Sequence, residues 1–157
     1  MPPQFLFDFS GIDLNKVLFG PDVIREFNLQ RGDMEHLDAI VWVDSEKDLI
    51  LGYKDVRPDE FWVPGHIPGR PLLPGVIMIE AAAQLSAFYT RKYVGWKGFI
   101  GFGGATDIRF RQMVEPGKRL YLLSKKIWER HGRISSKVQG MVDGSLVFEA
   151  DVVGTQM

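Results

Sequence analysis

Two side chains that can exchange protons, His66 and Glu80, lie fourteen residues apart, and an amide, Gln84, follows Glu80 after four more residues. His66 belongs to a stretch with repeated prolines and glycines (65–75), which cannot form a regular helix or a central strand. Histidine suits a general base because its ordinary pKa lies near neutrality. These residue types and their spacing point to acid–base chemistry.

The residues after this loop form an almost unbroken apolar run, and we expect a helix from about Pro74 to Arg91. A helix of roughly 18 residues would be ~27 Å long. Its apolar residues cover every face, which predicts a helix that is buried all round. Glu80 and Gln84 share one face of it. A carboxyl group buried there needs a partner or has a raised pKa, and a carboxyl that stays protonated suits a general acid.

Each of these residues also has a structural interpretation. A lone histidine in a loop is usually structural or solvated, and we expect that of His36 and His131. Glu80 can be a satisfied structural carboxylate, bonded for instance to a backbone N–H. Gln84 can hydrogen-bond Glu80 or a loop carbonyl, or take part in the site. No second histidine has the spacing of a metal ligand, so we expect no metal.

Composition limits the class of protein. The chain has 157 residues, 45% of them apolar, a net charge of −1 and no cysteine. We expect one domain, no disulfides and no general binding of nucleic acid. The longest apolar run is broken at Glu80 and Gln84, short of the ~20 residues of a membrane span. The start of the sequence does not resemble a signal peptide, so a cytoplasmic location is expected.

The rest of the sequence predicts an antiparallel sheet. Apolar and polar residues alternate through much of it, and Asp143-Gly144 is typical of a type I′ hairpin turn. We expect a short helix at 21–27 and strands at 36–43, 48–56, 98–114, 119–130, 133–142 and 145–153. The simplest packing wraps this sheet around the one long buried helix, an α+β fold.

The stretch from Gly65 to Gln84, GHIPGRPLLPGVIMIEAAAQ, resembles the signature of the β-hydroxyacyl-acyl-carrier-protein dehydratases of the FabZ type. The resemblance covers about residues 35–154 and leaves 1–35 as a variable N-terminal segment. Ile67, Met113 and Lys118 depart from the family's usual phenylalanine, proline and aspartate. A sister family that also isomerises the double bond usually has aspartate at the position of Glu80, so this chain resembles the plain dehydratase.

The resemblance implies a single hot-dog domain over residues 1–157 and dehydration of (3R)-3-hydroxyacyl thioesters to trans-2-enoyl thioesters in fatty acid-type biosynthesis. His66 would be the base and Glu80 the acid, meeting across the interface of a homodimer, or of a trimer of such dimers. The substrate would be carried on the pantetheine of an acyl carrier protein, with no other cofactor. We assign the N–H groups of Gly75 and Val76, at the open end of the helix, to the thioester oxyanion.

Two other functions fit the same residues. An acyl-thioester hydrolase on this fold would use Glu80 to activate water, and release of free thiol would distinguish it. A non-catalytic hot-dog subunit would bind an acyl chain or an acyl carrier protein without turnover. A histidine paired with a buried carboxyl group favours an enzyme over a binding module.

Overall fold

The computed structural model describes residues 4–157, so residues 1–3 of the predicted domain lie outside the described residues. One antiparallel sheet of six strands has the order β1-β2-β4-β5-β6-β3. Its strands are β1 (Ala39–Asp44), β2 (Leu49–Asp55), β3 (Ile100–Phe110), β4 (Arg119–Arg130), β5 (Arg133–Val142) and β6 (Ser145–Gln156). β4 and β5 begin and end at the predicted residues, and the ends of the other strands differ by a few residues. The predicted sheet is therefore confirmed.

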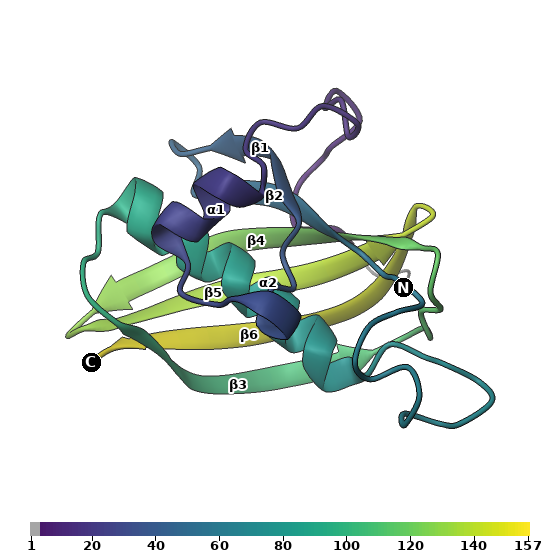
Figure 1. Ribbon diagram of the computed structural model, residues 1–157. Helices are drawn as coiled ribbons and strands as arrows, with labels where there is room; N and C mark the ends of the chain where they lie inside the picture. The colour runs from purple at the N-terminus through teal and green to yellow at the C-terminus, as the bar shows by residue number, and fades with distance from the viewer. Residues whose placement is uncertain (1–3) are drawn as a thin grey trace.

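The long helix α2 (Gly75–Tyr89) crosses one face of the sheet (Figure 1). Pro74, the predicted first residue of the helix, is its N-cap instead, because its ψ of 136° is not helical, and the helix begins one residue later at Gly75. The chain continues as a π-helical turn (Thr90–Val94) and stops at Gly95, whose φ of 90° favours glycine. The sheet curves around α2, as the sequence predicts.

The prediction that α2 is buried all round is wrong within one chain. Leu85 and Phe88 are fully buried against the sheet, but Val76 is 72% exposed. Ile79 and Glu80 are only half-buried. The reason is geometric, because the sheet covers one side of the helix and no described segment fully covers its first two turns.

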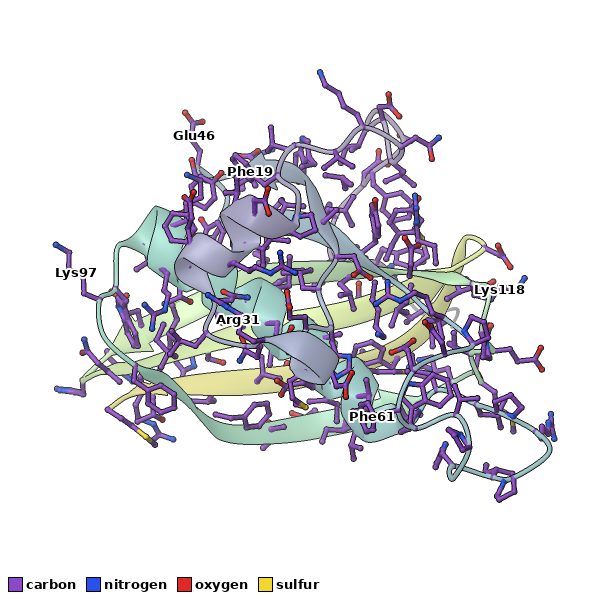
Figure 2. All side chains as sticks on the ribbon, in the orientation of Figure 1. Phe19, Arg31, Glu46, Phe61, Lys97 and Lys118 are labelled. Atoms are coloured by element: carbon purple, nitrogen blue, oxygen red, sulfur yellow. The ribbon has the colours of Figure 1, made fainter. Side chains whose placement is uncertain are left out.

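Residues before the sheet cover the middle of α2 on the side away from the strands. Helix α1 (Pro21–Phe27), which matches the prediction, and a 3-10 turn (Gly32–Met34) lie there (Figure 1). The Asn28 side chain donates to the backbone carbonyl of Gln84 at 3.0 Å. Arg31 lies over α2 in the same region and donates to the Asn28 carbonyl at 2.8 Å (Figure 2). These contacts attach the segment before β1 to the helix that carries Glu80.

The opposite face of the sheet carries a second apolar cluster. Phe5, Leu6, Phe7 and Phe9 pack there against buried side chains of β1, β2, β4 and β5. The buried Gln139 holds this segment, since its amide accepts from Leu6 N at 2.8 Å and donates to the Gln4 carbonyl at 2.9 Å. The part of the sheet formed by β1, β2, β4 and β5 is therefore covered on both faces.

Candidate active site

The loop between β2 and α2 orients His66 through two hydrogen bonds. Its backbone N–H donates to the Trp62 carbonyl at 2.8 Å, and its Nδ1 lies 2.7 Å from the Leu72 carbonyl oxygen. A carbonyl only accepts, so Nδ1 carries a proton, and in the neutral ring the lone pair is then on Nε2. His66 therefore has the tautomer that a general base at Nε2 requires.

Backbone strain lies directly beside His66. Ile67 has a φ of 58°, a conformation that β-branched residues rarely adopt. Gly69 follows with a φ of 85°. The exit of the loop is tied to the strand region by a bond of 2.8 Å from Leu73 N to the Val114 carbonyl. Strain of this kind persists only where contacts with the surrounding structure enforce the conformation, and it is concentrated at functional sites.

The first turn of α2 leaves two amides outside the helical pattern. Ile77 N and Met78 N both donate to the Pro74 carbonyl, at 3.0 and 3.2 Å, so helical hydrogen bonding begins at Ile77. Among the described residues, no acceptor binds the N–H groups of Gly75 or Val76. The space beside Gly75 is occupied, because a Cβ there would lie 2.7 Å from Phe110 Cζ. The turn has the free donors that an oxyanion needs, and glycine allows close packing of the Phe110 ring.

Glu80 and Gln84 form a hydrogen-bonded pair one turn apart on α2. Gln84 Nε2 donates to Glu80 Oε1 at 2.9 Å and also to the Met34 carbonyl at 2.8 Å. Gln84 Oε1 accepts from His36 N at 2.9 Å. Both functional groups of the amide are thus engaged, and Gln84 has one possible orientation. Glu80 is left with Oε2 free of any partner among the described residues.

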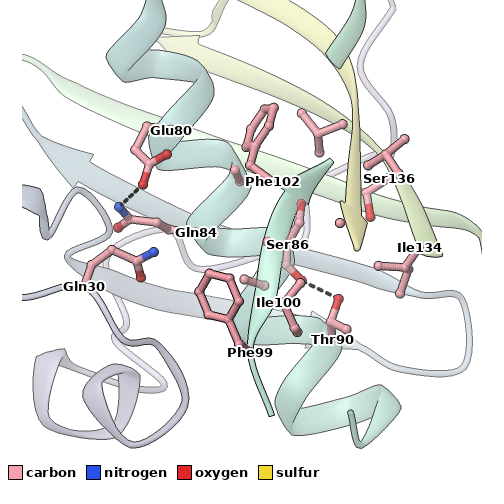
Figure 3. Close-up of a pocket in the computed structure, with 16 residues that line it drawn as sticks. Gln30, Glu80, Gln84, Ser86, Thr90, Phe99, Ile100, Phe102, Ile134 and Ser136 are labelled. Carbon is pink, nitrogen blue, oxygen red and sulfur yellow. Dashed lines mark hydrogen bonds between the residues drawn. The ribbon is translucent and has the colours of Figure 1, made fainter. Parts of the chain in front are cut away.

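A pocket of about 210 Å³ opens beside this pair (Figure 3). On one side it is bounded by α2 from Glu80 to Thr90, and on the other by residues of β3, β5 and β6. Small residues of α2, Ala83 and Ala87, leave room for it. The remaining lining residues are Gln30, Gln84, Ser86, Phe99, Ile100, Gly101, Phe102, Ile134, Ser136, Val152, Val153 and Gly154. The pocket is largely apolar, with a carboxyl group and an amide at the Glu80 end.

A family model described as a FabA-like domain matches residues 29–151 of this chain. The chain belongs to the FabA-like family. The 3-hydroxyacyl-[acyl-carrier-protein] dehydratase FabZ of Desulfotalea psychrophila is 34% identical over 122 residues, 76% of this chain and 81% of that protein. The FabZ of Mannheimia succiniciproducens is 40% identical over 111 residues, 69% of this chain and 73% of that protein. These relatives place the chain among the FabZ-type dehydratases.

Solved structures agree with the fold of this family. The dehydratase heterocomplex ApeI:P from Xenorhabdus doucetiae superposes with a TM-score of 0.71 at 16% identity, over 85% of this chain and 90% of that one. The predicted hot-dog fold is thereby confirmed. No helix among residues 4–157 is both long and apolar enough to cross a membrane.

Within one chain of this FabZ-type protein, the predicted site residues fall into two groups. Glu80 and Gln84 line the pocket together. His66, Gly75 and Val76 are not among its lining residues, and no hydrogen bond joins His66 to Glu80 in the described part of the chain. The assigned roles of all five residues stay predictions.

One edge of the sheet is open and apolar. β3 pairs with β6 alone, and it is the outermost strand of the sheet. Apolar side chains with 39–67% of their surface exposed gather on it and beside it: Phe99, Phe102, Ile108, Phe110 and Met113. Phe110 also contacts the first turn of α2 at Gly75. An edge strand with such side chains is suited to pair with another chain.

Sequence reasoning missed two sets of residues around the site. Gln30 lines the pocket, and its Oε1 is buried without a partner in the described structure. His36 was expected to be structural or solvated, and its 1% exposure fits the structural alternative; its contact with Gln84 through the backbone N–H was not predicted. Lys54 is fully buried beside it. A lysine within the mostly apolar strand predicted at 48–56 was the available signal for this second set.

Proposed function

We propose that this chain dehydrates (3R)-3-hydroxyacyl thioesters, carried on the pantetheine of an acyl carrier protein, to trans-2-enoyl thioesters. The observation that carries the proposal is the pair of Glu80 and Gln84 at one end of an apolar pocket. A carboxyl group fixed at one end of this apolar pocket supplies an acid where the substrate hydroxyl would lie. The names of the FabZ relatives supply the carrier and the 3-hydroxyacyl group.

We propose the following steps for these residues. His66 Nε2 takes the proton on the carbon next to the thioester carbonyl, and the N–H groups of Gly75 and Val76 bind the oxygen on which charge develops. The bond between C3 and its hydroxyl oxygen then breaks. The Glu80 carboxyl gives its proton to that oxygen, and water leaves. One C–H and one C–O bond of the substrate break, one C=C bond and one O–H bond of water form, and His66 ends with a proton while Glu80 has given one up. No electron donor or acceptor is needed.

The site requires two copies of the chain in this proposal. No hydrogen bond or ion pair joins His66 to Glu80 in the described part of one chain, whereas the open edge of β3 offers an apolar surface for a second chain. A homodimer paired at this edge would place His66 of one protomer opposite Glu80 of its partner. It would also cover Val76 and Phe61, which are 72% and 52% exposed in one chain. We take the whole chain as one catalytic domain that acts in the cytoplasm.

The test is direct. Purified protein is incubated with 3-hydroxybutyryl and longer 3-hydroxyacyl thioesters of acyl carrier protein, and enoyl absorbance and free thiol are followed in parallel. We expect the wild type to form enoyl product. We expect His66→Ala and Glu80→Gln each to lose most of this activity while their circular dichroism spectra stay unchanged. Thiol release without enoyl product would identify a thioester hydrolase instead. Acyl carrier binding without either product would identify a binding subunit.

A further inference from the structure

An ion pair between a fully buried lysine and a largely buried glutamate lies behind the candidate site. Lys54 of β2 has no exposed side-chain surface, and Glu60, in the loop after β2, has 8%. Lys54 Nζ lies 2.6 Å from Glu60 Oε1 and 3.2 Å from His36 Nδ1. The three side chains form one hydrogen-bonded cluster, which the steps of the proposed reaction do not use.

The direction of each hydrogen bond in the cluster is fixed. An ammonium group only donates, so His36 Nδ1 accepts and the proton of the neutral ring lies on Nε2. Burial, and next to it the charge of Lys54, lower the pKa of His36 from 6.5 to about 4, which keeps the ring neutral at pH 7. Burial raises the pKa of Glu60, but hydrogen bonds from Lys54 and Arg57 N outweigh it, and the pKa lies below its usual value.

One branch from the cluster leads to Glu80. His36 accepts from Lys54 through its ring and donates through its backbone N–H to Gln84 Oε1 at 2.9 Å. The other end of the Gln84 amide donates to Glu80 Oε1. Without the acceptor at Nδ1, His36 is no longer held by Lys54. Because His36 holds Gln84 and Gln84 holds Glu80, the position of Glu80 would be less fixed.

The other branch leads to His66. Glu60 Oε1 accepts from Trp62 Nε1 at 3.2 Å, and Glu60 Oε2 accepts from Arg57 N at 2.8 Å. Trp62 is 5% exposed, and its carbonyl accepts from His66 N at 2.8 Å. Glu60 therefore fixes the start of the loop that sets the position of His66.

Stability alone does not explain this cluster. Replacing a buried ion pair with apolar residues of similar volume is often neutral or stabilising, because desolvation offsets the attraction between the charges. The cluster also leaves His36 Nε2 buried with no partner among the described residues. A buried donor without an acceptor costs free energy, which points to a role other than stability.

We infer that Lys54, Glu60 and His36 are positioning residues that hold the acid and the base of one chain in a fixed relation through two hydrogen-bonded branches. The inference rests on the proposed function of His66 and Glu80. None of the three touches substrate in it. If the homodimer forms as proposed, each cluster positions the base of one active site and the acid of the other.

His36 gives the cleanest test of the branch to Glu80. His36→Leu removes the acceptor for Lys54, whereas His36→Asn keeps an oxygen near the position of Nδ1 and the same backbone N–H. We expect kcat of His36→Leu to fall about ten- to a hundred-fold, with KM nearly unchanged, because small displacements of an acid are costly. His36→Asn should recover most of this loss. If both folded variants keep wild-type kcat, or if His36→Asn recovers nothing, the inference is overturned.

A second pair of variants tests the whole cluster. Lys54→Met/Glu60→Gln removes both charges together, so neither is left buried alone. Lys137→Met/Asp151→Asn makes the same changes at a pair joining β5 to β6, whose Nζ and Oδ1 lie 3.1 Å apart. Circular dichroism and thermal unfolding establish that both variants fold. We expect only the first to lose kcat, and equal kcat in the two folded variants overturns the inference.

A double-mutant cycle with Gln84→Met shows whether the branch acts through Gln84. If it does, His36→Leu lowers kcat only slightly in the Gln84→Met background. If the fold-losses in kcat of the two single variants instead multiply in the double variant, the branch is overturned. Assays of His66→Ala and Glu80→Gln in the same series separate the two hypotheses. Full activity in those two variants overturns the proposed function itself. If those two variants lose activity while the variants of the cluster keep wild-type kcat, the inference is overturned and the proposed function is not.

Discussion

Gln84 Nε2 donates a hydrogen bond of 2.9 Å to Glu80 Oε1, and this bond cannot reverse. The same nitrogen also donates to the Met34 carbonyl, and the amide oxygen accepts from His36 N. An amide held at both ends by backbone groups has no freedom to flip. Glu80 Oε1 is thus always an acceptor, and Oε2 is left as the oxygen that can carry the proton for the substrate hydroxyl.

We therefore expect Gln84→Met to lower kcat by about ten- to a hundred-fold, with little change in KM, because it releases the acid without altering the pocket volume greatly. Gln139→Met is the matched control. Gln139 is a buried glutamine with two backbone partners, but it holds the N-terminal segment on the opposite face of the sheet. The Gln139→Met variant should have a lower melting temperature and an unchanged kcat. Equal kcat in both variants would show that Gln84 is only structural.

The sequence located the candidate residues in the right elements because the relevant signals are local. A proline- and glycine-rich loop, an apolar run and two polar residues four positions apart located His66, Glu80 and Gln84 in adjoining elements. The bond between Glu80 and Gln84 was one of the roles left open for the amide. The exposure of Val76 was missed, since an apolar helix surface can be covered by a second chain as well as by its own sheet.

The buried cluster could not be predicted from the sequence. Lys54 and His36 are eighteen residues apart on segments that the pairing of β1 with β2 brings together. Strand alternation does not say whether a lysine points to solvent or into a core when both faces are covered. The positive φ of Ile67 was equally hidden, because β-branched residues rarely adopt it and no local pattern favours it there.

Mixing two inactive variants tests whether each site uses two chains. His66→Ala and Glu80→Gln, unfolded and refolded together at equal concentration, would form mixed dimers with one intact and one doubly altered site. Half of the dimers would be mixed, so we expect about a quarter of wild-type activity to return. Recovery requires His66 of one protomer to act with Glu80 of its partner. Mixed dimers that form, as verified with distinct affinity tags, and remain inactive would place both residues in sites within one chain.

The neutral His36 makes stability depend on pH in a defined window. Its pKa in the folded chain, about 4, lies below the ordinary 6.5, so the unfolded chain binds a proton at a higher pH than the folded chain. The stabilisation is complete above pH 6.5 and is lost as pH falls toward 4. The loss should be on the order of 3 kcal/mol in free energy of unfolding.

Urea unfolding at a series of pH values measures this dependence. Glu60 faces the same cluster, but its pKa lies below its usual 4.5, so the upper part of the window reports His36 alone. The wild type should lose stability steadily below pH 6.5, and His36→Asn should not. A slope between pH 6.5 and 5 that is identical in both proteins would mean that His36 titrates normally in the folded chain.

The pocket predicts how acyl chain length is selected. Ala87 lies seven residues after Glu80 on α2, or ~10 Å farther along the pocket at 1.5 Å per residue. Ala87→Leu would fill this part and leave the Glu80 end open, so kcat/KM for a four-carbon substrate should stay within about two-fold while longer chains lose more than ~10-fold. Ala87→Ser, with a side chain of nearly the same size, should keep the wild-type profile. A uniform loss over all chain lengths in Ala87→Leu would mean that the acyl chain lies elsewhere.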